Sequence, residues 1–343
     1  MLKMKNKKSV FSAAALGAVL SVSLLFSSSV SAIAPTYAKW ASRTKVIYAS
    51  SGSIEWAAGA AKWKNATNFN VSTGGTDKSY YAYTVNDSSV TWDGICSTTV
   101  NAGIITSATL KLNTYFTSQP KYTTAIINGV TGHEIGHSLG LEHTGIVETT
   151  SIMNPYTFDS SNVPVRALSP SSSDITATNS LYPLLQSAAT NASTGYHSAD
   201  GIYLSPSWAV YYEDEEALTK AADLVVKGTV SKEKGNTFKA RGEYQTYKKE
   251  VRLEVAEVLK GDISLLNSSI SVAQMGGSDG IVTVYGEHTT HLNKNQEVVL
   301  FLRKTEDNTY IPINEDDSIF VINQTGGINN ISTQKQLDIN TLQ

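Results

Sequence analysis

Apolar and polar residues alternate most regularly between positions 108 and 113. The residues at 108, 110 and 112 are apolar and those at 109, 111 and 113 are polar, a period of two that marks a β-strand. One apolar and one polar face are typical of a strand with one side in water, so we predict an edge strand. Shorter β-branched and aromatic runs predict strands at 46–48, 71–73, 80–85 and 90–92.

Two segments have the apolar spacing of helices. Residues 54, 57, 58 and 61 predict a helix over 53–65, with Ser53 as its cap. A second stripe at 126, 127, 130 and 135 predicts a helix that begins near 121–124 and ends at Leu139. Glycines at 129, 132 and 136 lower its intrinsic propensity, so tertiary packing must hold this helix. Pro183 stops the last helix before the linker.

The pattern changes in the second half of the chain. The Ser, Thr, Asn and Ala-rich stretch over 186–200 predicts a linker. Short β-rich runs then follow one another, separated by Gly, Asn and Asp, at 224–230, 249–259, 269–273, 298–302 and 319–322. We therefore predict a β-rich C-terminal domain over 201–343, folded as a β-barrel or a β-sandwich.

One eleven-residue segment carries the chemistry. Residues 133–143 read His-Glu-Ile-Gly-His-Ser-Leu-Gly-Leu-Glu-His. His133 and His137 are four apart and share a helix face, so both can bind one zinc ion. Gly140 can turn the chain out of the helix, which lets His143 return as third ligand. Glu134 can then act as general base towards a zinc-bound water, because three protein ligands leave the fourth position open.

The alternative is that these histidines are ordinary buried residues. Five specified positions coincide in a chain with only six histidines, and chance would produce such a match with a probability on the order of 10⁻⁵. The sequence therefore predicts a catalytic zinc site, with His133, His137 and His143 as metal ligands and Glu134 as the catalytic base.

This motif, followed by Met153 in Ser-Ile-Met-Asn-Pro-Tyr, resembles the metzincin zinc endopeptidases and most of all the matrixins. The resemblance covers about 40–185 and includes Thr144, directly after the third histidine. It also includes Ser172 to Tyr182, which is similar to the helix that closes a matrixin catalytic domain. It implies an α+β metzincin catalytic domain, here 39–185, in which a twisted mixed sheet packs on the active-site helix. It also implies that Met153 forms an apolar floor beneath the imidazoles.

The matrixin resemblance makes three further statements about the site. The substrate would lie extended against the strand at 108–113, and the loop from Pro155 to about Ser169 would shape the specificity pocket. Tyr156 would be pocket wall and not a ligand. Matrixins commonly bind a structural Ca²⁺ beside the catalytic Zn²⁺. No run of acids in this chain has a convincing calcium-loop spacing, and Asp77, Asp87 and Asp93 are the candidates. In the C-terminal domain, 222–228 and 255–261 are weakly similar to netrin-like domains, which include metalloproteinase inhibitors built on OB-type barrels.

Residues 1–32 have the pattern of a secretory signal peptide. Four lysines precede an apolar run from Val10 to Phe26, and Val30-Ser31-Ala32 offers a cleavage site, with Ala38 as a later alternative. A membrane anchor is the competing interpretation, although serines interrupt the run. We expect an extracellular, Gram-positive-like secreted protein, monomeric and with no membrane anchor in its mature form.

Composition narrows the partners. The chain has 27 basic and 30 acidic side chains, a net charge of −3. Removal of the signal segment leaves 23 and 30, a net charge of −7, which argues against nucleic acid and for protein or peptide substrates. The single cysteine, Cys96, cannot form an internal disulfide, and we expect a half-buried structural thiol and not a cap on the zinc.

Two other clusters compete for attention. His288 and His291 form an H-x-x-H pair, but positions three apart on a strand face opposite sides, so we expect ordinary exposed histidines. The acidic run 213–216 predicts the solvated start of a helix, with calcium binding as its alternative.

Two functions remain open on the sequence alone. The first is a secreted zinc endopeptidase whose C-terminal domain positions substrate or regulates the enzyme, also as a tethered inhibitor. The second is a binding protein that has kept the metzincin fold and lost activity. Glu134 favours the enzyme, because an inactive relative would be expected to lose the base first.

Overall fold

The computed structural model describes residues 33–184, 199–241 and 244–342. The predicted signal segment and most of the predicted linker therefore lie outside the described residues. In contact terms, the described residues belong to one compact unit. Among them, no helix is both long and apolar enough to cross a bilayer.

The first part of the chain forms the predicted strands and helices in order, except that the strand predicted at 90–92 begins only at residue 92 and that α2 and β6 were not predicted. They are β1 (Thr44–Ala49), α1 (Ser53–Ala66), β2 (Asn70–Thr73), β3 (Tyr80–Val85), β4 (Trp92–Asn101), β5 (Ile104–Asn113), α2 (Thr114–Thr117), α3 (Thr124–Ser138), β6 (Tyr156–Asp159) and α4 (Ser172–Leu181). The helices predicted over 53–65, up to Leu139 and over 172–182 are α1, α3 and α4. Gly52, with a left-handed φ of 65°, takes the cap position of α1 in place of Ser53.

The second part is rich in strands. It contains β7 (Gly201–Tyr211), α5 (Glu215–Ala221), β8 (Leu224–Arg241), β9 (Tyr244–Lys260), β10 (Ser269–Met275), β11 (Gly277–Ser278), β12 (Thr283–Gly286), β13 (Glu297–Lys304), β14 (Tyr310–Pro312), β15 (Ile319–Ile322) and β16 (Ile328–Asn330). Three short 3₁₀ turns, η1 (Ile263–Leu265), η2 (Glu315–Ser318) and η3 (Ile339–Leu342), complete it. The acidic run starts α5, where Asp214 caps the helix by accepting a hydrogen bond from the Ala217 N–H.

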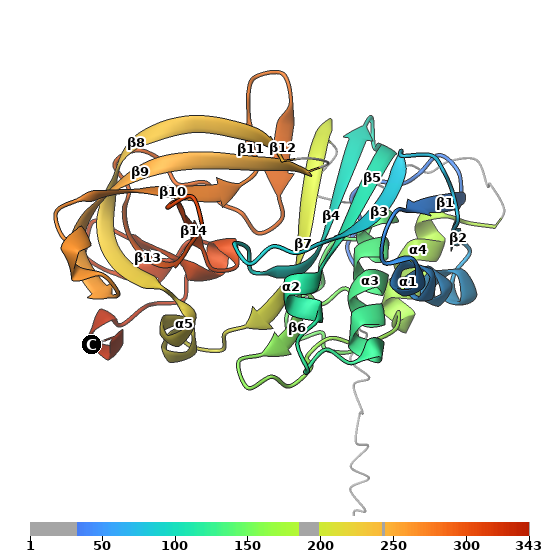
Figure 1. The fold of residues 1–343 in the computed structure, drawn as a ribbon, viewed down its shortest axis with the longest axis horizontal. Coiled ribbons are helices and arrows are strands. Elements are labelled where there is room, and N and C mark those ends of the chain that lie inside the picture. The colour runs from blue at the N-terminus through green and yellow to red at the C-terminus, as the bar shows by residue number, and fades with distance from the viewer. Residues whose placement is uncertain (1–32, 185–198, 242–243, 343) are drawn as a thin grey trace, which may run out of the picture. The chain divides into compact units, whose positions relative to one another are not determined.

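The first sheet is mixed. In the described residues its strands follow the order β11-β12-β7-β4-β5-β3-β1-β2, with β6 also paired to β7. The pairs β2–β1, β1–β3 and β3–β5 are parallel, whereas β4 is antiparallel to both β5 and β7. Helices α1 and α3 pack side by side against this sheet (Figure 1), and the Trp63 indole N–H donates to the Gly132 carbonyl 2.6 Å away.

The prediction that 108–113 forms an edge strand is wrong. These residues are the end of β5, which has β3 on one side and β4 on the other. Leu110 and Leu112 are buried as predicted, but Lys111 is only half-exposed. Alternation reports the two faces of a strand and carries no information about its two edges, so an interior strand can have the same pattern.

The second sheet closes into a barrel. Strands β8, β9, β10, β14 and β13 pair in a ring, because β14 pairs with both β10 and β13. The predicted α+β fold is confirmed, and the C-terminal strands form the barrel alternative. The predicted domain limits stay a prediction, but β7, β11 and β12 come from the predicted C-terminal domain and join the first sheet.

The barrel has a buried acid whose protonation couples to stability. Glu315 in η2 is buried, one carboxylate oxygen accepts the Met275 N–H at 3.0 Å, and the other has no partner among the described residues. Burial raises the pKa of this carboxyl from 4.5 to about 8. The unfolded chain therefore loses the proton near pH 4.5, whereas the folded protein keeps it to about pH 8.

We expect the contribution of protonated Glu315 to be complete below pH 4.5 and to be lost as pH rises towards 8. Glu315→Gln should therefore raise the free energy of unfolding at pH 8 by about 2 kcal/mol and flatten its fall between pH 5 and 8. Denaturant unfolding at a series of pH values measures this, with exposed Glu306→Gln as control. A variant as pH-dependent as the parent would contradict it.

Candidate metal centre

Helix α3 and the turn after it bring the predicted ligands together. The Thr123 side chain caps the helix by accepting from the Ile126 N–H. Two residues after the helix ends, Gly140 has a φ of 99°, and a Cβ there would collide with the Ala38 carbonyl oxygen. Only glycine suits both demands. The chain therefore turns sharply, and His143 comes back towards the two histidines of the helix.

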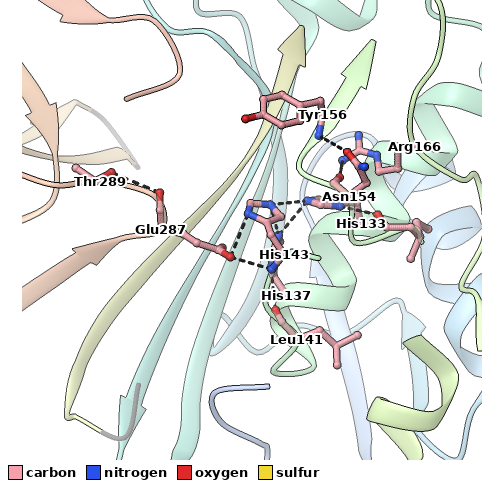
Figure 2. A network of polar contacts seen from close by, with 10 residues as sticks. His133, His137, Leu141, His143, Asn154, Tyr156, Arg166, Glu287 and Thr289 are labelled. Carbon is pink, nitrogen blue, oxygen red and sulfur yellow. Dashed lines mark hydrogen bonds and ion pairs between the residues drawn. The ribbon is translucent and has the colours of Figure 1, made fainter. Parts of the chain in front are cut away.

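The three imidazoles meet at one point. The Nε2 atom of His137 lies 2.9 Å from that of His133 and 3.1 Å from that of His143, and the last pair is 3.2 Å apart. Figure 2 shows the three rings converging from α3 and the following loop. All three side chains are buried. Tetrahedral zinc, with bonds of 2.0–2.1 Å, holds its ligands about 3.4 Å apart, so the spacing fits this ion.

The outer nitrogen of each ring decides which atom faces the centre. His133 Nδ1 lies 2.7 Å from the Ile152 carbonyl, and His137 Nδ1 lies 2.8 Å from that of Leu141. His143 Nδ1 lies 3.1 Å from Glu287 Oε1. The two carbonyls require a proton on Nδ1 of His133 and His137, and the carboxylate beside His143 Nδ1 favours the same tautomer there. In this tautomer the Nε2 contacts are not hydrogen bonds but three facing lone pairs. They repel one another unless a cation lies between them.

Burial also keeps these rings neutral. It is the largest cause that lowers the pKa of all three, to about 3 for His137 and well below the ordinary value for His133. For His143, Glu287 opposes the shift. Neutral imidazole is the form that binds zinc, so the donor set, its tautomers and its spacing all fit a zinc ion.

Glu134 lies beside this centre on the same helix. Its side chain is fully buried, and neither carboxylate oxygen has a hydrogen-bond partner among the described residues. Burial raises the pKa of this carboxyl well above its usual value, whereas Arg166 opposes the shift. A Cβ on Gly94 of β4 would lie 2.5 Å from Glu134 Oε1, so β4 passes the carboxylate at close range.

The segment around Met153 is fixed from below. Met153 is fully buried, its sulfur lies against Gly136 of α3, and its carbonyl accepts the Thr144 N–H at 3.0 Å. Asp174 of α4 accepts from the Ser151 hydroxyl at 2.7 Å and from the Ile152 N–H at 3.1 Å. Because the Ile152 carbonyl orients His133, Asp174 acts on the centre indirectly. The sequence analysis did not assign it this part.

One comparison with known proteins agrees with this geometry. A family model described as matrixin matches residues 55–183. These residues are a matrixin domain, and the chain is a metalloendopeptidase. Among solved structures, high choriolytic enzyme 1, a hatching enzyme zinc-protease from the medaka fish Oryzias latipes, is 14% identical over 43% of this chain and 94% of its own, with a TM-score of 0.28. None of the curated proteins compared with the chain matches it.

Two expectations about other metal ligands can be compared with the structure. Asp77 bonds to Ser79 and Asp87 to Ser89, and Asp93 lies elsewhere in a polar network. In the described residues, none of these three belongs to a group of side chains that could hold a metal ion. His291 bonds to the Met275 carbonyl at 2.9 Å, and His288 stacks on His143, so they do not share a site.

Cys96 and Tyr156 have structural surroundings. The Cys96 thiol is fully buried in β4, not half-buried as expected, and burial raises its pKa well above the usual value. The Tyr156 hydroxyl donates to Asp317 Oδ2 at 2.8 Å, which is consistent with a wall position away from the zinc ligands.

The matrixin domain contains a second buried polar network next to Glu134. Arg166 donates to the Asn154 carbonyl, to Thr157 Oγ1 and to the hydroxyl of Ser207 in β7. Asp93 accepts from that same hydroxyl at 2.7 Å and from the Tyr122 hydroxyl at 2.7 Å. Sequence reasoning placed Asp93 with calcium and did not single out Arg166, which lies inside the loop predicted to shape the specificity pocket.

The free edge of the matrixin sheet is occupied. Strand β7 runs antiparallel along β4 and parallel to β6. The prediction that substrate would lie on 108–113 is therefore wrong, because β4 separates those residues from the edge. Glu287, which follows β12, donates its N–H to the Leu204 carbonyl of β7 and accepts the His143 N–H at 2.8 Å (Figure 2).

Glu287 is the functional residue that the sequence analysis missed. It lies 144 positions after His143 and belongs to no motif. A carboxylate on the outer nitrogen of a ligating imidazole fixes its tautomer and raises its basicity, and its removal costs 10–100-fold in metal affinity. Nothing in the local sequence could have revealed this contact.

We expect Glu287→Ala to weaken zinc binding by at least about tenfold, because His143 loses the carboxylate that orients its ring. Titration against a chelator of known affinity measures the change. Glu142→Gln provides the matched control, since Glu142 and Glu287 line one small cavity beside β7. Equal zinc affinity in the Glu287 variant and the parent would contradict the assignment.

Proposed function

We propose that this chain is a secreted zinc endopeptidase in which His133, His137 and His143 hold the metal and Glu134 is the general base. The observation that carries the proposal is the meeting of three buried, neutral Nε2 lone pairs beside an unpartnered carboxylate. A binding protein would have no use for that carboxylate, whose burial costs free energy.

The residues perform distinct steps of the hydrolysis. Zinc, when bound, supplies a Lewis acid that activates water and polarises the peptide carbonyl. Glu134 accepts a proton from the attacking water and delivers it to the departing amine. Strand β4 binds the substrate main chain by strand addition, so the scissile bond passes the Glu134 carboxylate near Gly94.

We further propose that residues 201–343 regulate the enzyme by closing it. A bound peptide would need the edge of β4, and β7 already pairs there along positions 201–208. Glu134 and all three histidines are buried under this arrangement. Regulation is favoured over substrate positioning because β7 itself pairs with the edge of β4 to which a substrate peptide would bind.

Export fits the same proposal. Ala34 and Tyr37 are buried in the core, and the Tyr37 hydroxyl donates to the His137 carbonyl at 2.8 Å. Cleavage after Ala32 keeps this contact, whereas cleavage after Ala38 would remove it. We therefore favour the earlier of the two predicted cleavage positions for the secreted form.

The test of the base compares residues 33–343 with their Glu134→Ala variant, each assayed for zinc content and for cleavage of unfolded casein. We expect one zinc per chain in both, and a fall in cleavage of at least about 10²-fold in the variant, because the proton acceptor is lost. Zinc in both proteins with equal cleavage would contradict the role of Glu134. If every form binds zinc and none cleaves casein, including the Trp208→Ala variant described next, the binding-protein alternative would be favoured.

The proposed closure is tested by weakening the packing of β7 against β4 and β6. Trp208 is buried opposite Trp92 of β4 and Tyr156 of β6, and its truncation to alanine costs about 3–5 kcal/mol of packing. We expect Trp208→Ala to raise casein cleavage and the hydrogen exchange of the β4 amides. Val299→Ala, in the buried cluster that packs β13 against α5, is the control for general destabilisation. Equal cleavage in Trp208→Ala and the parent would overturn the regulatory role.

A further inference from the structure

We propose that Asp93 and Arg166 are specificity-determining residues, and that they select substrates with a small hydroxyl side chain, serine or threonine, at the residue that pairs with Gly94. The inference rests on the proposed endopeptidase function and concerns the same cleft. Ser207 of β7 shows how such a side chain is held, because its main chain takes the place opposite Gly94.

The hydroxyl of Ser207 makes two hydrogen bonds of opposite sense. It donates to Asp93 Oδ1 at 2.7 Å and accepts from Arg166 Nη1 at 2.8 Å. Both partners belong to the matrixin domain, from β4 and from the loop after Met153, whereas Ser207 arrives from outside it. The polar pocket is therefore built by the enzyme, and the serine is its occupant.

The pocket is buried and lined by hydrogen-bonded groups. Asp93 and Ser207 are fully buried, and Arg166 is 6% exposed. Tyr122 donates to the second oxygen of Asp93, while the Asn154 carbonyl and Thr157 Oγ1 accept from Arg166. The Ser207 hydroxyl oxygen lies between the first oxygen of Asp93 and Nη1 of Arg166. Sites that bind a hydroxyl in this way reject the analogue that lacks it, because buried polar groups are left unpaired.

Other side chains satisfy the pocket less well. An apolar side chain leaves both Asp93 and Arg166 without their partner. A carboxylate faces Asp93 with a like charge, and Glu134 lies close by; an ammonium faces Arg166. Only a hydroxyl group both donates a hydrogen bond to Asp93 and accepts one from Arg166 through the same oxygen atom. The position next to Glu134 is therefore the one at which sequence preference should appear.

The first test removes only the hydroxyl from β7 in residues 33–343. Ser207→Ala should loosen the closing strand and raise casein cleavage at least about tenfold, since two hydrogen bonds to charged groups are lost. Ser205→Ala is the matched control: Ser205 is also buried and lies two residues earlier on the same face of β7. Equal cleavage by Ser207→Ala and the parent would count against the pocket.

The second test reads the substrate directly. The Ser207→Ala enzyme digests a mixture of denatured proteins, and mass spectrometry identifies the cleaved bonds. We expect Ser and Thr to be enriched at one fixed position beside the scissile bond. Paired synthetic peptides with Ser or Ala at that position should differ in kcat/KM by at least about tenfold. Asp93→Asn, with its zinc content as the check on folding, should reduce that ratio.

The outcomes distinguish a failure of the hydroxyl preference from a failure of the endopeptidase function. Casein cleavage that depends on Glu134 but shows no hydroxyl preference overturns this inference and leaves the endopeptidase intact. If neither the parent nor Ser207→Ala cleaves casein, both fall. Should Asp93→Asn fail to fold, the Ser and Ala peptide pair still decides the matter.

Discussion

Three neutral imidazoles pointing their lone pairs at one spot form the constraint on which this structure depends. Such an arrangement is unfavourable without a cation, and the residues around the three rings hold them in place. Carbonyl groups of Ile152 and Leu141 accept the outer protons of two rings, and the carboxylate of Glu287 lies against the outer nitrogen of the third. Asp174 fixes the segment that supplies the first of these carbonyls, and Gly140 provides the turn that returns His143.

The second sheet partner of β4 explains why the centre is buried. In the described residues, β7 joins β4 to β6 and β12 in one continuous sheet, so the catalytic half and the barrel half share hydrogen bonds where a peptide would lie. The same strand carries Ser207 into the Asp93–Arg166 pocket and bonds to Glu287. The proposed control of access, the proposed specificity and the orientation of one ligand thus all involve a single segment of eleven residues.

Local chemistry was readable from the sequence, and long-range pairing was not. The helix periodicity, the glycine turn and the histidine spacing lie within about twenty residues and obey rules of helix geometry, so α3 and the convergence of its histidines were predictable. The position of β5 inside the sheet depends on which strand pairs with its other edge, which alternation does not encode. Glu287 and Ser207 act across 144 and 114 residues, and only the fold brings them to the site.

The contact between Glu287 and His143 has a thermodynamic consequence. Because Glu287 reaches the imidazole only while β12 lies on β7, closing the sheet and binding the metal each strengthen the other by the same free energy. Zinc is then held most firmly in the resting form and less firmly once the cleft is open. The working enzyme would therefore have a built-in lifetime, ended by the loss of its own metal unless the surroundings supply more.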